Sequence, residues 1–206
     1  VENDTVFAYS TDRSGTIINR ATLTSTRNKN YGIYAAGRAT NLGDINFGSG
    51  VGNVGMYSIS GGRAINGSST INSVIRVSAS DKTNKLFGIG MAAGYRSSDS
   101  GNVINSPTGV INVNGKNSIG MYATGPLSTA TNKGKILLQA ENTIGMYLDN
   151  GATGVNEGTI TTVGSPKGVK GVVPTIETQG IIKYEGGIEP YVAGVKVVGY
   201  DLEKAI

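Results

Sequence analysis

Four tyrosines recur at one position of a repeated motif, and they are the side chains best suited to bind a ligand. Tyr34, Tyr57, Tyr122 and Tyr147 each follow a Gly-apolar pair. A tyrosine offers an apolar ring and a polar hydroxyl, which suits sugar rings and the surfaces of partner proteins. Stacked tyrosines can equally shield the hydrogen bonds of a sheet. Two interpretations therefore remain open, a ligand-contact stripe and a purely structural stripe.

A second group of candidate contacts is Tyr95, Arg96 and Asp99, in a stretch rich in Ser and Gly. The stretch lies within a longer than average repeat. Insertions in repeat proteins form loops on one face, which is often the face used for binding. We name these three side chains as possible ligand contacts, with a tolerated surface loop as the alternative.

The composition gives little support to catalytic or metal chemistry. The chain has no cysteine and no histidine, which excludes disulfides, thiolate sites, cysteine nucleophiles and histidine triads. The 14 acidic residues are scattered, and Asp44, Asp149 and Glu157 lie in or beside expected turns. No close carboxylate pair recurs in adjacent repeats, as glycoside cleavage would require. We predict that the chain is not an enzyme and has no metal site and no cofactor.

The charge is mildly basic and unevenly distributed. The formal net charge is +4. All arginines fall in the first hundred residues, at positions 13, 20, 27, 38, 63, 76 and 96. A basic N-terminal half could bind anionic glycans or nucleic acid. Because the arginines are dispersed along the sequence and no nucleic-acid motif accompanies them, we interpret them as a solvated surface and predict no nucleic-acid partner. No apolar run is long enough to span a bilayer as a helix, so we predict no membrane contact by this segment.

A repeat runs through the chain and must position these residues. Its clearest copies begin at Ile119-Gly120-Met121-Tyr122 and Ile144-Gly145-Met146-Tyr147, each followed by Ala/Gly-x-Asn-x-Gly-x-Ile. Equivalent positions recur at intervals of 23 to 35 residues. All four methionines, Met56, Met91, Met121 and Met146, share one repeat position. Such a period indicates a solenoid, a propeller or an array.

Most repeats are too short for a four-stranded propeller blade, and the leucine framework of leucine-rich repeats is missing. With 32 glycines and many Asn, Ser and Thr residues, the chain favours short strands joined by turns. We predict an all-β parallel β-helix, a solenoid of about seven coils. Antiparallel hairpins are the alternative, but they do not explain why methionine recurs in register.

Stacked coils would place equivalent residues in columns. In each first strand we expect the Ile144, Met146 and Leu148 side to face one way and the Gly145 and Tyr147 side the other. The inward column is then Val6, Ile33, Met56, Met91, Met121, Met146, Val169 and Val195. A second inward column is Ile17, Ile45, Ile75, Ile111, Ile136, Ile160 and Ile182. A third column near a turn is Asn41, Asn66, Asn105, Asn132 and Asn156, whose amides can hydrogen-bond along the axis. The outward column is Phe7, Tyr34, Tyr57, Ala92, Tyr122, Tyr147, Lys170 and Lys196.

We interpret residues 1–206 as a single β-helix segment of a longer chain. Looped insertions are expected at about 58–86 and 94–107, close to each other in space, and a less regular coil at 171–206. Since no polar cap follows the last expected strand, we also expect the rest of the same chain to pack against the C-terminal end.

The Gly-Met-Tyr and Asn-x-Gly-x-Ile motifs, best preserved over residues 109–169, resemble the repeats of fusobacterial autotransporter adhesins of the type V class. The resemblance implies a right-handed parallel β-helix exposed at the bacterial cell surface and attached to the outer membrane. It carries over no ligand-binding residue, because the repeat belongs to the rod.

Adhesion is the function that this resemblance implies, either coaggregation or host attachment. The partner would be a cell-surface glycan or protein of another bacterium or of a host cell. The alternatives are a purely structural stalk and, less favoured, a polysaccharide-cleaving β-helix enzyme.

Overall fold

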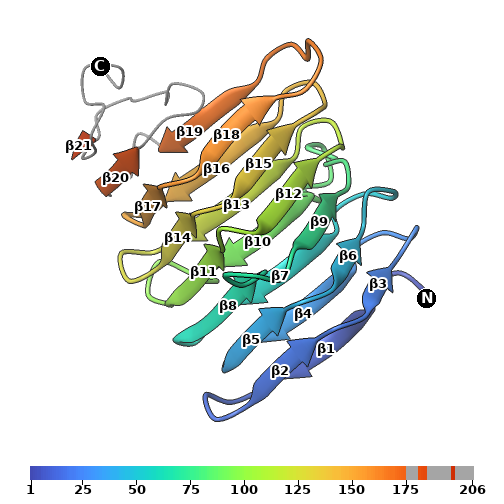
Figure 1. Cartoon of the computed structure of the whole chain (residues 1–206), viewed down its shortest axis with the longest axis vertical. Helices are drawn as coiled ribbons and strands as arrows, with labels where there is room; N and C mark the ends of the chain where they lie inside the picture. The colour runs from blue at the N-terminus through green and yellow to red at the C-terminus, as the bar shows by residue number, and fades with distance from the viewer. Residues whose placement is uncertain (175–180, 185–195, 198–206) are drawn as a thin grey trace.

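The computed structural model describes residues 1–174, 181–184 and 196–197. Within these residues every regular element is a β-strand, and the strands form three parallel sheets (Figure 1). The first sheet contains β1 (Val6–Ser10), β4 (Tyr31–Ala35), β7 (Val54–Ser58), β10 (Ile89–Ala93), β13 (Ile119–Thr124), β16 (Ile144–Asp149) and β19 (Lys170–Pro174). The second contains β2 (Thr16–Asn19), β5 (Arg38–Asn41), β8 (Gly62–Asn66), β11 (Gly101–Asn105), β14 (Thr129–Asn132), β17 (Thr153–Asn156), β20 (Ile181–Tyr184) and β21 (Lys196–Val197). The third contains β3 (Thr22–Thr24), β6 (Asp44–Asn46), β9 (Ser73–Val77), β12 (Gly109–Val113), β15 (Lys135–Leu138) and β18 (Thr159–Thr162).

This arrangement is a parallel β-helix, as predicted. Strands β1 to β18 form six complete coils of three strands each, and β19 and β20 begin a seventh. Each strand pairs with its equivalents one coil below and one coil above, so that the coils rise along the axis of the stack (Figure 1). Every coil therefore depends on its neighbours for backbone hydrogen bonds.

The methionine column is confirmed in its central part and wrong at its ends. Met56, Met91, Met121 and Met146 stack in register and are fully buried. At the N-terminal end Ala8, not Val6, pairs with Ile33. At the C-terminal end Val172, not Val169, pairs with Met146. Because the terminal copies have lost the Gly-Met-Tyr motif, the residues expected in the column lie two or three positions before the residues that pair there. Val195 lies outside the described residues.

The isoleucine column belongs to the third sheet and begins with Leu23, which pairs with Ile45. Ile75, Ile111, Ile136 and Ile160 continue it. Two expected members were wrong, because Ile17 and Ile182 lie in the second sheet, opposite Ala39 and Gly154. The inward positions of that sheet are otherwise mostly small, which leaves room for the large residues of the other two sheets.

The asparagine ladder is confirmed and begins one coil earlier than expected. Starting at Asn19, each amide Nδ2 donates to the Oδ1 of the next asparagine, over 2.7 to 3.0 Å. The members are Asn19, Asn41, Asn66, Asn105, Asn132 and Asn156, and all but Asn19 are fully buried. Because buried amides are costly without partners, the continuous chain of hydrogen bonds holds the coils in register.

The expected alternation in the first sheet is wrong at the glycine. Gly145 faces the core, since a Cβ there would lie 2.5 Å from Ile160 Cγ2, and Ile144 faces outward. Two consecutive residues, glycine and methionine, thus point inward in each of these strands. The glycines form their own column, in which a Cβ on any member would lie 2.5 to 2.7 Å from a carbonyl oxygen of the next coil. This close approach explains why the motif requires glycine.

The looped insertions are narrower than expected. Strands β8 and β9 occupy much of 58–86, so the extra residues lie at 67–72 and 78–88. Strand β11 lies within 94–107, which leaves a loop at 94–100. The two expected ranges do meet, since the amides of Ser60 and Gly61 donate to Asp99 and to the Ser100 carbonyl oxygen. The loop at 78–88, however, precedes β10 and the loop at 94–100 follows it, so these two loops lie at opposite ends of that strand. Of the range 171–206, the structure describes only the end of β19 and the strands β20 and β21.

Candidate ligand-binding groove

The outer face of the first sheet carries two adjacent columns of apolar and aromatic side chains. The first column is Val6, Tyr31, Val54, Ile89, Ile119 and Ile144. The second is Tyr9, Tyr34, Tyr57, Ala92, Tyr122 and Tyr147. Both columns point outward because the intervening Gly-Met pair points inward. The repeat thus builds an apolar surface along the length of the rod as well as its core.

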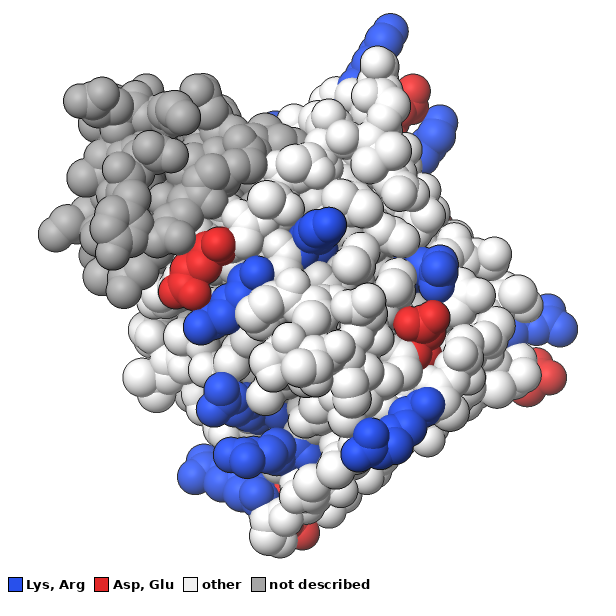
Figure 2. All heavy atoms as spheres, in the orientation of Figure 1, with Lys and Arg blue, Asp and Glu red and all other residues white. Residues whose placement is uncertain are grey.

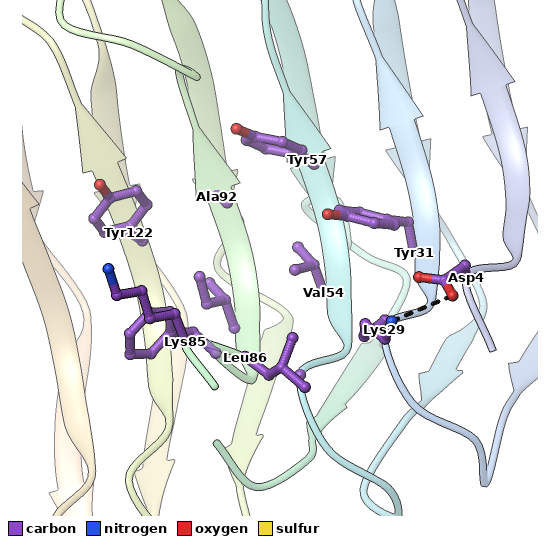
Figure 3. Close-up of a pocket in the computed structure, with 12 residues that line it drawn as sticks. Asp4, Lys29, Tyr31, Val54, Tyr57, Lys85, Leu86, Ala92 and Tyr122 are labelled. Atoms are coloured by element: carbon purple, nitrogen blue, oxygen red, sulfur yellow. Dashed lines mark ion pairs between the residues drawn. The ribbon is translucent and has the colours of Figure 1, made fainter. Parts of the chain in front are cut away.

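Three hollows along these columns merge into one surface groove, which we call the sheet-1 groove. Their volumes are about 270, 400 and 500 Å³. The first two share Phe87, Ile89 and Tyr122, and the first and third share Tyr31. Figure 3 shows Tyr31 and Tyr57 projecting from the neighbouring strands β4 and β7, and Tyr122 from β13, with the small Ala92 on β10 between the last two. The groove is therefore lined by rings and aliphatic side chains, which is the usual lining of a binding site.

Polar residues at the corner before each strand form one rim of the groove. Asp4, Lys29, Asn117 and Asn142 occupy equivalent places and have left-handed backbones, with φ between 55° and 60°. Asparagine and aspartate tolerate this conformation better than most residues. Lys29 pairs with Asp4 at 3.4 Å (Figure 3), and Lys85 lies further along the rim. An apolar floor with a charged rim can orient a ligand that carries polar groups.

Four tyrosines pack together at the N-terminal end of the groove, and we call them the N-terminal tyrosine cluster. They are Tyr9, Tyr31, Tyr34 and Tyr57. Tyr34 and Tyr57 meet edge to face at 5.2 Å, and Tyr31 stacks on Tyr57 at 6.1 Å. Tyr9 and Tyr31 each also contact Tyr34, at 5.3 and 5.8 Å. Edge-to-face and offset pairs are the favoured aromatic geometries, so the cluster stabilises itself.

Tyr57 is the most constrained member of the cluster. Its hydroxyl donates to the carbonyl oxygen of Gly94 at 2.9 Å. Burial, and then the neighbouring Tyr34, raise the pKa of Tyr57 well above its ordinary value. Burial likewise raises the pKa of Tyr31 and Tyr34. These hydroxyls stay protonated at neutral pH and act as neutral hydrogen-bonding groups.

Tyr122 and Tyr147 stack on each other further along the groove, and we call them the C-terminal tyrosine pair. Their ring centroids are 5.8 Å apart and their planes 19° apart. The pair lines the hollow of about 400 Å³ together with Ile119, Ile144 and Phe87. Burial raises the pKa of Tyr122, an effect opposed by its hydrogen bond with Thr124. Here the rings adjoin aliphatic side chains and an open hollow instead of further rings.

Three expected members of the outward column were wrong. Phe7 packs inward, with its ring 5.5 Å from the buried Phe47, and Tyr9 takes its place. Lys170 pairs with Ile144 and so belongs to the first column, whereas Lys196 lies in the second sheet. Sequence reasoning missed Tyr31 and Tyr9. Tyr31 immediately precedes the motif glycine, a position that points outward only because the glycine points inward.

The loop at 94–100 lies beside the N-terminal tyrosine cluster. Asp99 accepts hydrogen bonds from the backbone amides of Ser60 and Tyr95, at 2.9 and 3.0 Å. The Arg96 guanidinium lies 5.1 Å from the centre of the exposed Tyr95 ring, a cation–π contact. Through Gly94 this loop also holds Tyr57. The structure therefore gathers Tyr95, Arg96 and Asp99 near Tyr34 and Tyr57, while the C-terminal pair lies beyond Ala92.

The described part of the chain lacks two kinds of feature, a cluster of metal-binding side chains and a membrane-spanning helix. There, no group of three or more His, Cys, Asp or Glu side chains is placed to hold a metal ion. In the same residues there is no helix with the length and apolar character needed to cross a membrane.

Comparison with known proteins gives one family. A family model described as the BigA third pectate lyase-like domain matches residues 2–159. The match agrees with the coarse expectation of a passenger-like β-helix, whereas the fusobacterial group stays a prediction. No curated protein and no solved structure gives a significant match.

Proposed function

Because the chain belongs to the family of the BigA third pectate lyase-like domain, we propose that it is a surface-exposed β-helical segment of a bacterial adhesin. The family takes its name from BigA, a bacterial surface protein of the adhesin and autotransporter-like type. An extracellular location for this chain, on a passenger attached to the outer membrane, follows from that proposal. The fusobacterial resemblance adds partner bacteria and host cells as targets.

The observation that carries the proposal is the sheet-1 groove. It runs over neighbouring coils as a contiguous surface of tyrosines and aliphatic side chains with a charged rim. Contiguous exposed apolar surfaces of this kind mark interaction sites in soluble proteins. The groove sits on a rigid rod whose coils are fixed in register, so its contacts are organised before a ligand arrives. We propose that a cell-surface glycan or protein binds along it.

A structural spacer is the second candidate function. The asparagine ladder crosses all six complete coils without a break, which suits a rod that projects something else from the surface. The two functions differ in one respect, because a spacer binds nothing through the groove.

The test is binding of the purified segment to a glycan array and to partner bacterial and epithelial cells. Tyr122→Ala/Tyr147→Ala removes the C-terminal pair, and Arg96→Ala alters the neighbouring loop. Leu127→Ala is the matched control, since Leu127 is 72% exposed and lines none of the three hollows. We expect the tyrosine variant to lose at least tenfold in affinity and the control to bind as the original does. If the original segment binds none of these targets, the adhesive function is wrong and the structural spacer is the favoured function.

We further propose that the chain has no catalytic activity, since "pectate lyase-like" describes a fold and not a reaction. The scattered acidic residues support this proposal. Incubation with pectin and other acidic polysaccharides should release no reducing ends and no unsaturated products. The release of either product would contradict this proposal and make polysaccharide cleavage the favoured function.

A further inference from the structure

Three arginines that are far apart in sequence lie at one corner of the rod, where the first sheet ends and the second begins. We call them the arginine corner, Arg13, Arg38 and Arg63. Arg38 and Arg63 are direct partners in the neighbouring strands β5 and β8. Arg13 Nε donates to the carbonyl oxygen of Ser60, 2.9 Å away and just before β8. The arginines are dispersed in sequence, but the expectation that they do not cluster is wrong for these three of the seven, because stacking of the coils brings them together.

The positive charge of this corner is not neutralised by ion pairs. All three arginines are exposed. Among the described residues the ion pairs are Lys29–Asp4, Lys116–Glu141 and Lys133–Glu157, and none involves an arginine. Two carboxylates lie nearby, and neither forms an ion pair with these arginines: Asp12 accepts hydrogen bonds from Ser14 and Gly15, and Asp99 from the amides of Ser60 and Tyr95. Figure 2 shows basic side chains gathered at the lower left, where Figure 1 places the ends of β5 and β8.

Like charges on directly paired strands destabilise a sheet, so the Arg38–Arg63 pair costs stability without a counterion. The guanidinium of Arg13 is also held in place. It lies over Gly61, where a Cβ would approach Arg13 Nη2 to 3.1 Å, and its Nε is bonded to Ser60. Among the described residues, the terminal N–H groups of Arg13 donate no hydrogen bond. Held guanidinium groups with unused donors are suited to bidentate contact with planar anions.

We propose that the arginine corner binds an acidic polysaccharide through its sulfate or carboxylate groups. Arg38 and Arg63 are one coil apart, about 4.8 Å. The guanidinium of Arg13 lies beside the start of β8, so the three side chains offer a compact cluster of positive charge to a chain with repeated anionic groups. The exposed ring of Tyr95, beside Arg96, provides a stacking surface on the adjoining loop. The choice of a polysaccharide over nucleic acid rests on the proposed function, which places the rod outside the cell. The site itself is distinct from the sheet-1 groove.

The test uses a heparin-derived dodecasaccharide as the sulfated probe and an uncharged dextran oligosaccharide as its counterpart. The variant Arg38→Gln/Arg63→Gln removes two charges from the corner. Arg20→Gln/Lys135→Gln removes two charges from exposed residues elsewhere and is the matched control. We expect the corner variant to bind the sulfated probe at least tenfold more weakly, with a salt dependence reduced by about two counterions. The control should bind nearly as the original does, and dextran should not bind.

Equal affinity of the corner variant and its control would overturn the proposal, and so would tighter binding of a DNA duplex of the same charge. Circular dichroism checks that each variant keeps its β-structure. Should the double variant fail to fold, Arg13→Gln tests the same corner without touching a strand. The groove variant Tyr122→Ala/Tyr147→Ala should keep its affinity for the sulfated probe. Failure of the groove and failure of the corner are thus distinguishable.

Discussion

The N-terminal tyrosine cluster and the C-terminal tyrosine pair occupy one column of one sheet, but their surroundings differ. In the cluster the neighbouring outward column supplies another ring, Tyr31, and the loop at 94–100 accepts the hydroxyl of Tyr57. Around the pair the same column supplies Ile119 and Ile144, and an open hollow lies beside the rings. The rings of the cluster therefore pack mainly on one another, whereas the rings of the pair adjoin aliphatic side chains and a hollow.

A repeat position therefore determines which way a side chain points, but it does not determine which groups that side chain contacts. The adjacent column and the loops decide whether a tyrosine packs within the protein or faces a ligand. Ala92, buried between Tyr57 and Tyr122, separates the two environments.

Substituting the inward glycines should reduce stability most, and to the same extent in both regions. Strands in both regions contain members of the glycine column. Gly55→Ala and Gly145→Ala each place a Cβ 2.5 to 2.7 Å from a backbone oxygen and an isoleucine methyl. We expect each to lower the free energy of unfolding by about 2–3 kcal/mol. Gly48→Ala is the control, since its nearest neighbour would be 3.6 Å away, and should change it by less than about 1 kcal/mol. Urea denaturation measures the free energy of unfolding of all three variants. If Gly145→Ala were as stable as the original chain, the coils would differ in their core packing as well as on their outer face.

Removing the rings should separate the two regions. Among the described residues, Tyr34→Ala/Tyr57→Ala deletes four ring contacts, whereas Tyr122→Ala/Tyr147→Ala deletes one. Since an aromatic pair is worth about 0.5–1.5 kcal/mol, the cluster variant should be less stable than the pair variant by about 1–2 kcal/mol, allowing for partial exposure. For a ligand of the groove, in contrast, the pair variant should have the lower affinity and the cluster variant the higher. Equal stabilities would mean that the cluster is no better packed than the pair.

The sequence predicted the fold well because its strongest signals come from buried positions. Methionine in register, the asparagine ladder and the Asn-x-Gly-x-Ile motif each reflect a contact that repeats in every coil. Prediction failed where the coils are unequal: at β1 and β19, whose motifs have degenerated, and at the loops, whose lengths follow no period. Alternation also misplaced Gly145, since a strand that turns two neighbours inward departs from the period of two.

The site was predictable only in outline. Four tyrosines of the groove were identified from their shared repeat position, and Tyr31 was missed because its direction depends on the glycine beside it. The arginine corner was not predicted, since residues 38 and 63 are recognised as neighbours only when the register of the two adjacent coils is known. Sequence order hides such cross-coil groups unless the register is known.

Removing a single hydroxyl tests the contact between the cluster and the loop. Tyr57→Phe loses the hydrogen bond to the Gly94 carbonyl and should lower the free energy of unfolding by about 1 kcal/mol. Tyr9→Phe is the control, because Tyr9 is 61% exposed, and it should leave the stability unchanged. Chemical denaturation compares the two variants. A Tyr57→Phe variant as stable as the control would mean that the loop does not depend on this hydroxyl.

The smallest effect is a difference in alkaline stability. Burial raises the pKa of Tyr57, Tyr31 and Tyr34 in the cluster, and of Tyr122 in the pair. A raised pKa in the folded state favours the neutral hydroxyl, so this stabilisation is complete below the unfolded pKa of about 10 and is lost as the pH rises through the folded pKa. Tyr57→Phe should therefore lose less stability between about pH 9 and 11 than Tyr122→Phe, relative to each variant at neutral pH, because Tyr57 is shifted furthest. Urea denaturation across that range gives the two slopes, and identical slopes would show that the cluster and the pair are desolvated alike.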